Sequence, residues 1–266
     1  MLPCTEHCIH QLATLLLEEP DPQWKLISED EVREALNCMD SKKDSKKCCS
    51  AGYFPDLWKT QYVTAVPKSS KDPTSVSSWR PISILHPISK CFEKVIGKRL
   101  RNFLEGRNAF GSNQFGFREG HSTELASLLI TQFWADVNHS KVEIDAVFLD
   151  CTKAFDRVDP KVMLQKLEMF GVPTQCRRLV ESYLSNRRQV VTVNGKSSDV
   201  LPVTSGVPQG SVLGPILFIA LMSDTNTAVS PGTCLSLFAD DILVSRPQET
   251  ASDHSIFQPD LDNIAA

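Results

Sequence analysis

The stretch SLFADDILV, residues 236–244, places two adjacent aspartates between two apolar runs. The apolar runs have the composition of buried β-strands, and Asp240 and Asp241 fall where one strand would turn into the next. Burying an unpaired carboxylate is costly, so such groups usually neutralise, pair or bind a metal ion. The pattern therefore predicts either a surface hairpin with an Asp-Asp turn or a carboxylate site, and a carboxylate on a matching strand would favour the site.

A matching carboxylate occurs earlier in the chain. The apolar run AVFL at 146–149 has the pattern of a buried strand and ends at Asp150. Carboxylates from neighbouring strands can share two Mg²⁺ ions, which prefer hard oxygen ligands. Two such ions, about 3.5–4 Å apart, can activate an attacking hydroxyl group and stabilise a leaving pyrophosphate. We therefore expect Asp150, Asp240 and Asp241 to form a site for two Mg²⁺ ions, or for Mn²⁺ in their place.

The rest of the chain alternates helical and extended patterns. Apolar residues at helical spacing predict helices at about 92–103, 125–133, 160–170 and 173–184. In the second of these, one apolar face carries Leu125, Leu128, Leu129 and Phe133. Pro81 and Pro87 predict that the first helix follows an extended segment. Strands are expected at 62–66 and 189–193, and Asn194-Gly195 is the strongest short signal for a β-hairpin.

The composition is that of a globular protein. The chain has 266 residues, 41% of them hydrophobic, which fits one large domain or two small ones. Its nine cysteines are odd in number and irregularly spaced, so we expect free thiols in a reducing compartment. The Cys and His residues within 4–10 lack a second ligand pair at zinc-finger spacing. Because no apolar run reaches ~18 residues, we expect an intracellular protein, nuclear or cytoplasmic and not secreted.

Charge is unevenly distributed along the chain. The net charge of −4 by itself argues against a nucleic-acid partner, because phosphate binding uses Lys and Arg. Residues 42–118, however, contain 15 Lys or Arg and 5 Asp or Glu, a local balance of +10 that leaves −14 for the remainder. The run KKDSKK at 42–47 is typical of a solvated face or a weak nuclear-import signal. A basic third beside an acidic remainder suits a polyanion groove next to a metal site.

Six segments of the chain form a recognisable ordered series. Three of them are FLDCTKAFDRVD at 148–159, SGVPQGSVLGPILF at 205–218 and LFADDILV at 237–244. The other three are GYFPDLWK with PKSSKDP, then SWRPISILHPISKCFEKVI, and then NQFGFREGHSTELA. Together they cover roughly residues 52–247 and closely resemble the reverse transcriptases of non-LTR, LINE-type, jockey-like retrotransposons. FADD alone would be a weak motif, but six ordered blocks at family spacing are specific.

The resemblance implies a fold and a domain organisation. The fold class would be α+β, a right-hand polymerase palm in which helices back an antiparallel sheet, with partial fingers and the thumb missing. Residues 1–51 would be an N-terminal remnant, partly irregular and containing a fragment of the fingers. Residues 52–247 would form the fingers and palm of a reverse transcriptase domain, and residues 248–266 a truncated tail.

The resemblance also assigns the palm residues. Asp150, Asp240 and Asp241 would be the catalytic carboxylates and metal ligands, with Asp150 and Asp240 the principal ligands. Phe155 matches the aromatic side chain that blocks the ribose 2′-hydroxyl and so selects deoxynucleotides, although a plain core aromatic is the alternative. Gln209 matches the residue that faces the incoming nucleotide and template, and Gly210 beside it permits close backbone approach.

Three basic residues complete the implied site. Arg80 matches the fingers arginine that grips the nucleotide triphosphate, a role suited to a planar, always-charged group. Lys68 is a second candidate for the same role. Arg118, in QFGFR, either contacts the template backbone or is a solvated surface arginine. The implied partners are an RNA template, a DNA primer and deoxynucleoside triphosphates, without a membrane.

Two departures from the family pattern leave two hypotheses open. Between Leu36 and Gly52 the family has a longer insert with a glycine-containing fingers motif, whereas this chain has a bridge rich in Lys and Cys. The chain also stops at Ala266, where the family continues into a further palm strand, a primer grip and a thumb. We therefore expect either a metal-dependent RNA-directed DNA polymerase or a catalytically inactive retrotransposon remnant that folds and weakly binds nucleic acid.

Overall fold

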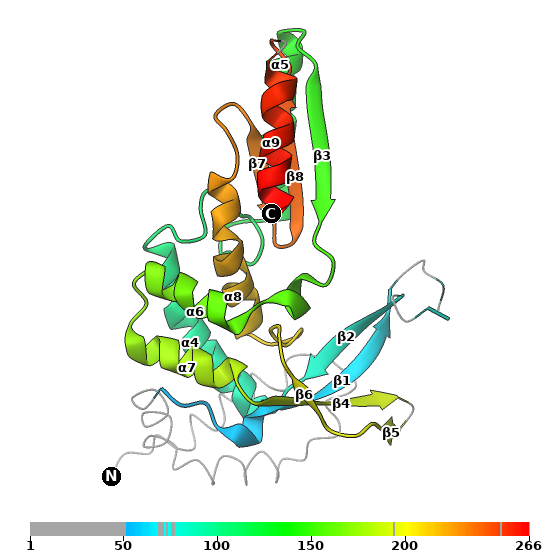
Figure 1. Cartoon of the computed structure of the whole chain (residues 1–266), viewed down its shortest axis with the longest axis vertical. Coiled ribbons are helices and arrows are strands. Elements are labelled where there is room, and N and C mark those ends of the chain that lie inside the picture. The colour runs from blue at the N-terminus through cyan, green and yellow to red at the C-terminus, as the bar shows by residue number, and fades with distance from the viewer. Residues whose placement is uncertain are drawn as a thin grey trace.

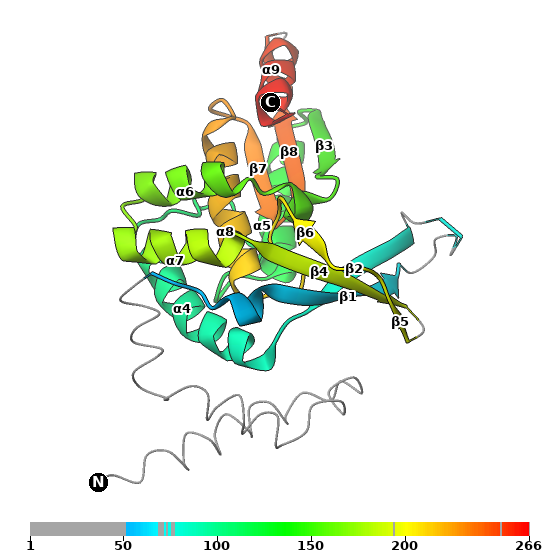
Figure 2. The ribbon, with the colours of Figure 1, turned by 60° about the horizontal axis from the view of Figure 1, so that its bottom comes forward.

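The computed structural model describes residues 52–68, 72, 74–75, 78–193, 195–250 and 252–265. A three-stranded sheet lies toward one end of the long axis and a five-stranded sheet toward the other (Figure 1). Helices α4, α6, α7 and α8 gather beside the five-stranded sheet, as a second view also shows (Figure 2). The N-terminal remnant expected at 1–51 lies outside the described residues.

The five-stranded sheet has the strand order β2-β1-β4-β5, with β6 also paired to β4. Its strands are β1 (Thr60–Pro67), β2 (Trp79–Ile84), β4 (Arg187–Val193), β5 (Lys196–Ser197) and β6 (Leu201–Val203). Strand β1 pairs with β2 in antiparallel and with β4 in parallel orientation. The hairpin expected at Asn194-Gly195 is confirmed by the antiparallel pairing of β4 with β5, and Gly195 supplies a positive φ of 75°.

The three-stranded sheet is antiparallel and has the order β3-β8-β7. Its strands are β3 (Ile144–Asp150), β7 (Cys234–Phe238) and β8 (Asp241–Pro247). Strands β7 and β8 form a hairpin in which Phe238 opposes Asp241, so the turn consists of Ala239 and Asp240. The buried strands expected on both sides of the two aspartates are therefore confirmed.

Two helices cover opposite faces of the three-stranded sheet. Helix α5 (Thr123–His139) lies on one face, where the indole N–H of Trp134 donates a hydrogen bond to Ser245 Oγ over 3.2 Å. Helix α9 (Asp253–Ala265) packs Phe257 against Ile242 and Val244, which point to the other face because strand side chains alternate. Residues expected to be a tail thus form a helix of this layer.

The main core lies among four helices, α4 (Pro87–Glu105), α6 (Pro160–Met169), α7 (Thr174–Leu184) and α8 (Leu213–Leu221). Helix α8 has the sequence LGPILFIAL and is apolar on all sides, as expected for a helix that is buried all round. Its first turn is capped from within the core, because the backbone N–H groups of Val212 and Leu213 donate to the buried carboxylate of Glu93. This cap fixes the point where α8 begins.

The helices follow the expected sequence signals, except for the start of α4 and the burial of α5. Asp159 caps α6 by accepting the N–H of Lys161 over 2.7 Å, and Gly171 follows the helix with a φ of 71°. Pro87 was expected in extended chain but is the first residue of α4, a position that needs no N–H. In α5, Leu128 and Leu129 are 64% and 51% exposed, so the expected apolar face is not a buried one.

Candidate active site

Three carboxylates meet at one end of the three-stranded sheet. Asp150 is the last residue of β3, and Asp241, the first residue of β8, is its direct partner in the antiparallel ladder. Asp240 precedes Asp241 in the two-residue turn, which we call the carboxylate turn (Ala239 and Asp240). Ala239 has a φ of 59°, a backbone conformation that residues other than glycine rarely adopt. The register of the sheet therefore brings together residues that are far apart in the sequence.

The three carboxylates act on one another electrostatically. Partial burial raises the pKa of Asp240 above its ordinary value, and the negative charges of Asp241 and Asp150 raise it further. The pKa of the neighbouring Cys151 thiol is raised by burial and then by the charges of Asp240 and Asp150. No described Lys or Arg forms an ion pair with any of the three carboxylates. The site therefore carries negative charge that no ion pair with a described Lys or Arg neutralises.

A divalent cation suits this arrangement. Within the described ranges, no three side chains of the His, Cys, Asp and Glu types, the three aspartates included, are gathered closely enough to hold a metal ion as a three-ligand site. Mg²⁺ does not need one, because it keeps several waters and is commonly held by one or two carboxylates together with substrate phosphates. Asp150 and Asp241 are exposed and Asp240 is half-buried, so their oxygens remain accessible. The residues present thus fit Mg²⁺ or Mn²⁺.

Phe155 lies in a short 3-10 helix (Ala154–Arg157) that follows β3. Its ring stacks on Phe218 of α8, with centroids 4.9 Å apart and an interplanar angle of 17°, and it meets the edge of Phe117 at 6.1 Å. The side chain is half-buried and packs against the main core. Phe155 is therefore a core contact on one side, while part of its surface remains accessible.

The loop that contains Gln209 packs directly on the Phe155 segment. Val207 N–H donates to the carbonyl of Phe155 over 2.9 Å, and Gly206 N–H donates to the carbonyl of Val158 over 2.8 Å. A Cβ on Gly206 would lie 2.7 Å from Asp156 Cα, so only glycine allows this approach. Phe155 and the loop 205–211 are thus held together.

The same loop is tied to the five-stranded sheet through β2. Ser83 N–H donates to the carbonyl of Gln209 over 2.8 Å. Gly210 has a φ of 105°, and a Cβ there would lie 2.9 Å from the carbonyl oxygen of Ser83. Arg80 is an exposed residue of the same strand, and Lys68 follows β1, with its N–H donating to the carbonyl of Ser78 over 2.8 Å. Strand β2 therefore links Arg80 to the Gln209 loop.

Residues 66–264 match a family model described as reverse transcriptase (RNA-dependent DNA polymerase). The chain belongs to this family. The membership predicted from the six sequence segments is therefore confirmed.

Relatives of this reverse transcriptase domain come from mobile elements of Drosophila melanogaster. The chain is 36% identical to the RNA-directed DNA polymerase from mobile element jockey over 200 residues, which are 73% of the chain and 22% of the relative. It is 35% identical to the probable RNA-directed DNA polymerase from transposon X-element over 207 residues, 76% of the chain and 23% of the relative. The matched region therefore spans under a quarter of these relatives.

Solved structures with the same fold include two telomerases. The apo telomerase from Candida tropicalis, truncated from its C-terminal domain, superposes with a TM-score of 0.57 at 12% identity, over 88% of this chain and 52% of that one. The Candida albicans telomerase in complex with the TWJ fragment of telomeric RNA gives 0.57 at 14% identity, over 90% and 45%. These similarities support the expected α+β class of the reverse transcriptase domain.

Arg118 has internal partners. Its Nε donates to Glu105 Oε1 over 2.9 Å and its Nη2 to Glu105 Oε2 over 2.6 Å, in a bidentate ion pair. Its Nη1 also donates to the carbonyls of Gly111 and Gln114, and the side chain is 8% exposed. These contacts give Arg118 a structural role, and the alternative of a solvated surface arginine was wrong. The template contact of Arg118 stays a prediction.

Sequence reasoning assigned no role to three residues of the same segment, Gln114, Gly116 and Phe117. Gln114 is buried and hydrogen-bonded to the carboxylate turn, and Gly116 lies against it. Phe117 has a positive φ of 59° and its ring meets Phe155. The local signal for these residues was weak, since it consisted only of a glycine between two aromatic residues.

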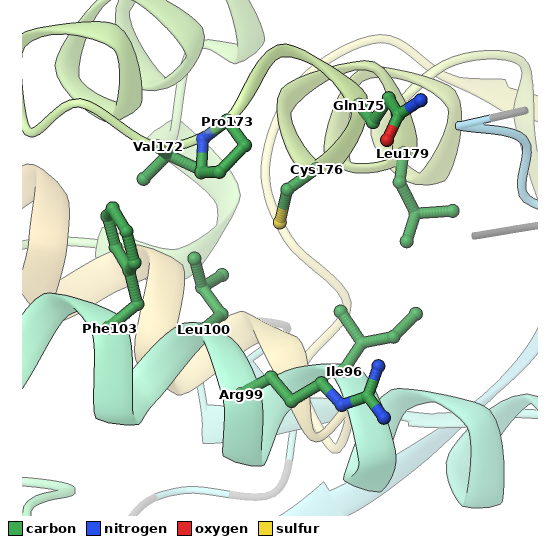
Figure 3. Close-up of a pocket in the computed structure, with 9 residues that line it drawn as sticks. All are labelled: Ile96, Arg99, Leu100, Phe103, Val172, Pro173, Gln175, Cys176 and Leu179. Carbon is green, nitrogen blue, oxygen red and sulfur yellow. The ribbon is translucent and has the colours of Figure 1, made fainter. Parts of the chain in front are cut away.

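An apolar cavity of about 270 Å³ lies between α4 and α7 (Figure 3). It is lined by Ile96, Arg99, Leu100, Phe103, Val172, Pro173, Gln175, Cys176 and Leu179. The thiol of Cys176 and the side chains of Leu179 and Phe103 surround the cavity in this view. None of the candidate site residues lines it, so the cavity takes no part in the carboxylate site.

Proposed function

We propose that this chain carries the nucleotidyl-transfer centre of an RNA-directed DNA polymerase of a LINE-type retrotransposon. The observation that carries the proposal is the pairing of Asp150 with Asp241 across β3 and β8, with Asp240 beside them on the turn. The three-stranded sheet with α5 and α9 would be the polymerase palm. The five-stranded sheet with Arg80 and Lys68 would form part of the fingers.

The carboxylates would act on the primer and the nucleotide through bound metal. Two Mg²⁺ ions, or Mn²⁺, would activate the primer 3′-hydroxyl and neutralise charge on the triphosphate. Asp150 and Asp240 would be the principal ligands, and Asp241 would contribute further negative charge. Because most of phosphoryl-transfer catalysis is positioning and charge stabilisation, the rigid ladder between β3 and β8 is suited to this task.

The Phe155 segment and the Gln209 loop would form the nucleotide site. Phe155 would exclude a ribose 2′-hydroxyl by steric contact, and its stack on Phe218 would hold its ring in place. Gln209 and Gly210 would face the nucleotide and the template. Arg80 would contact the triphosphate from β2, which the Ser83–Gln209 hydrogen bond ties to this loop, and Lys68 is a second candidate. Deoxynucleoside triphosphates, a DNA primer and an RNA template are the proposed partners.

Primer extension tests this function. The 266-residue chain should bind a DNA primer annealed to an RNA template weakly, with affinity falling steeply as salt rises, because phosphate contacts release counterions. We expect extension by no more than a very few nucleotides. Appending the residues that follow the matched region in the jockey relative should increase Mg²⁺-dependent synthesis.

Asp240→Asn should abolish the synthesis and keep most of the binding. Asp199→Asn, an exposed aspartate between β5 and β6, is the matched control and should leave both unchanged. Synthesis that survives Asp240→Asn would contradict the proposed carboxylate mechanism. Binding without synthesis in every form, including the extended one, would favour the catalytically inactive nucleic-acid-binding protein instead.

A further inference from the structure

Gln114 is a buried glutamine whose amide group is hydrogen-bonded to the carboxylate turn. Only 1% of its surface is exposed. Its Oε1 accepts the backbone N–H of Ala239 over 2.9 Å and that of Gly116 over 2.8 Å, and its Nε2 donates to the carbonyl of Ala239 over 3.4 Å. One side chain therefore contacts both polar backbone groups of the residue that precedes Asp240.

The backbone around Gln114 is anchored to the same hairpin. Leu237 N–H donates to the carbonyl of Asn113 and Phe115 N–H donates to the carbonyl of Leu237, each over 2.8 Å, so this segment runs parallel to β7. A Cβ on Gly116 would lie 2.3 Å from the backbone nitrogen of Ala239. The segment thus lies directly against the carboxylate turn, and its backbone hydrogen bonds to Leu237 hold Gln114 beside it.

The contact matters because Ala239 adopts a conformation that is unfavourable for alanine. Its φ of 59° brings its Cβ close to the following carbonyl, and glycine is the usual residue at such a position. A strained residue of this kind persists only where its surroundings determine its conformation, and such residues occur often at functional sites. Gln114 supplies that constraint by pairing with the N–H and the carbonyl of Ala239 together.

We propose that Gln114 is a positioning residue of the metal site. By holding Ala239 in the left-handed conformation, it sets the direction in which Asp240 leaves the turn and keeps Asp240 and Asp241 in place relative to Asp150. This inference rests on the proposed function, since it concerns the binding of metal by those carboxylates. A glutamine that only stabilised the core would affect stability without a specific effect on the turn.

Mn²⁺ titration of the 266-residue chain, followed by the paramagnetic resonance of free Mn²⁺, tests the inference. Gln114→Met keeps the length of the side chain and removes its three hydrogen bonds. It should weaken Mn²⁺ binding by about tenfold, as loss of an outer-shell partner of a metal ligand typically does. The matched control is Gln61→Met, since Gln61 is a buried glutamine of β1 that bonds Arg187. That control should leave the affinity within about twofold of wild type, because distant sites act independently.

A double-mutant cycle with Ala239→Gly isolates the mechanism. Glycine adopts positive φ readily, so the turn would no longer need Gln114 to hold it. In the Ala239→Gly background, Gln114→Met should therefore weaken Mn²⁺ binding by less than about threefold, which is a non-additive result. If Gln114→Met alone does not fold, Gln114→Asn, whose amide is one methylene too short to reach Ala239, takes its place in both backgrounds. An equal tenfold loss in both backgrounds would overturn the proposed mechanism, as would equal losses from Gln114→Met and Gln61→Met.

Hydrogen exchange of the Ala239 and Asp240 amides separates this inference from the proposed function. Gln114→Met should speed exchange at these two amides by about tenfold or more, whereas Gln61→Met should not, because local opening depends on local contacts. If wild type shows no Mn²⁺ binding that Asp240→Asn removes, the proposed function fails and the exchange data decide whether Gln114 holds the turn. Unchanged exchange at both amides in Gln114→Met would overturn the role of Gln114.

Discussion

Asp150 and Asp241 are direct partners in the ladder between β3 and β8, so two like charges face each other across the sheet. Like charges in directly opposed positions of a sheet destabilise the folded state by roughly 0.2–1 kcal/mol. The arrangement therefore has a cost in the metal-free chain, and metal binding would remove that cost.

Asp241→Asn should raise the free energy of unfolding in chelator by about 0.5 kcal/mol, because the opposed charges are gone. Added Mg²⁺ should stabilise wild type more than the variant, since a ligand stabilises the state that binds it. Urea unfolding with chelator and with Mg²⁺ measures both effects, and Asp199→Asn is the control. A variant less stable than wild type in chelator would show that the opposed charges carry no cost.

Phe155→Val should have two separate effects. It removes the stack on Phe218 and should cost about 1–3 kcal/mol of stability, less than the loss of a fully buried aromatic. In the extended form that synthesises DNA, it should also admit ribonucleotides, because the clash with the 2′-hydroxyl is removed. Phe103→Val, which alters a half-buried aromatic at the core edge in α4, should reduce stability and leave sugar selection unchanged. Unchanged discrimination in Phe155→Val would leave Phe155 as a core residue alone.

Arg118→Met should destabilise the fold by about 2 kcal/mol, a typical value for lost hydrogen bonds to a charged group. Binding of primer and template should change little, because the guanidinium of Arg118 already forms a bidentate ion pair with Glu105. Arg101→Met is the comparison, since its ion pair with Glu119 is more exposed and should be worth less than about 1 kcal/mol. Urea unfolding and fluorescence anisotropy measure the two properties. A large loss of binding with unchanged stability would restore the template contact.

The packing of α9 on β8 should depend on pH through Asp253. Hydrogen bonds from Thr250 and from Arg246 lower the pKa of Asp253 to about 2. An unfolded aspartate has a pKa of about 3.9, so the folded state favours the ionised form. The stability advantage of wild type over Asp253→Asn should be complete above about pH 4 and disappear as the pH falls toward about 2.

Urea midpoints across that pH range measure the advantage. Asp262→Asn, an exposed change on the same helix, should show no such pH dependence. An advantage of wild type that stayed constant down to about pH 2 would mean that ionisation of Asp253 does not contribute.

The sequence was most informative where the relevant signal is local. The strand ending at Asp150 and the two strands around Asp240 and Asp241 followed from runs of apolar residues, and their pairing brings the three aspartates together. The expected burial of the strand ending at Asp150 was wrong, because no residue of β3 is buried and Phe148 is 76% exposed at this edge of the sheet. The start of α6 was predicted from Asp159, which caps the helix, and from the proline that follows it. Each of these signals depends on a few neighbouring residues and on backbone geometry.

Residues whose roles depend on distant partners could not be predicted in the same way. The ion pair between Arg118 and Glu105 joins the end of α4 to a loop, so the charge of Arg118 alone indicated only a surface or template contact. The exposure of Leu128 and Leu129 depends on how α5 sits on its sheet. Gln114 reaches a residue 125 positions away, and no local pattern indicates such a contact.

That separation has a consequence for the order of assembly. The β7–β8 hairpin joins neighbouring strands and can form locally. Its turn, however, is supported by residues 113–116, which lie more than 100 positions earlier in the chain. Contacts between positions far apart in the chain form slowly, because the entropy of closing the intervening loop must be lost before they stabilise anything. We therefore expect the carboxylate turn to reach its final shape only after residues 113–116 have docked against the hairpin. A partly folded nascent chain would contain every acidic residue of the centre without presenting a centre that could bind metal.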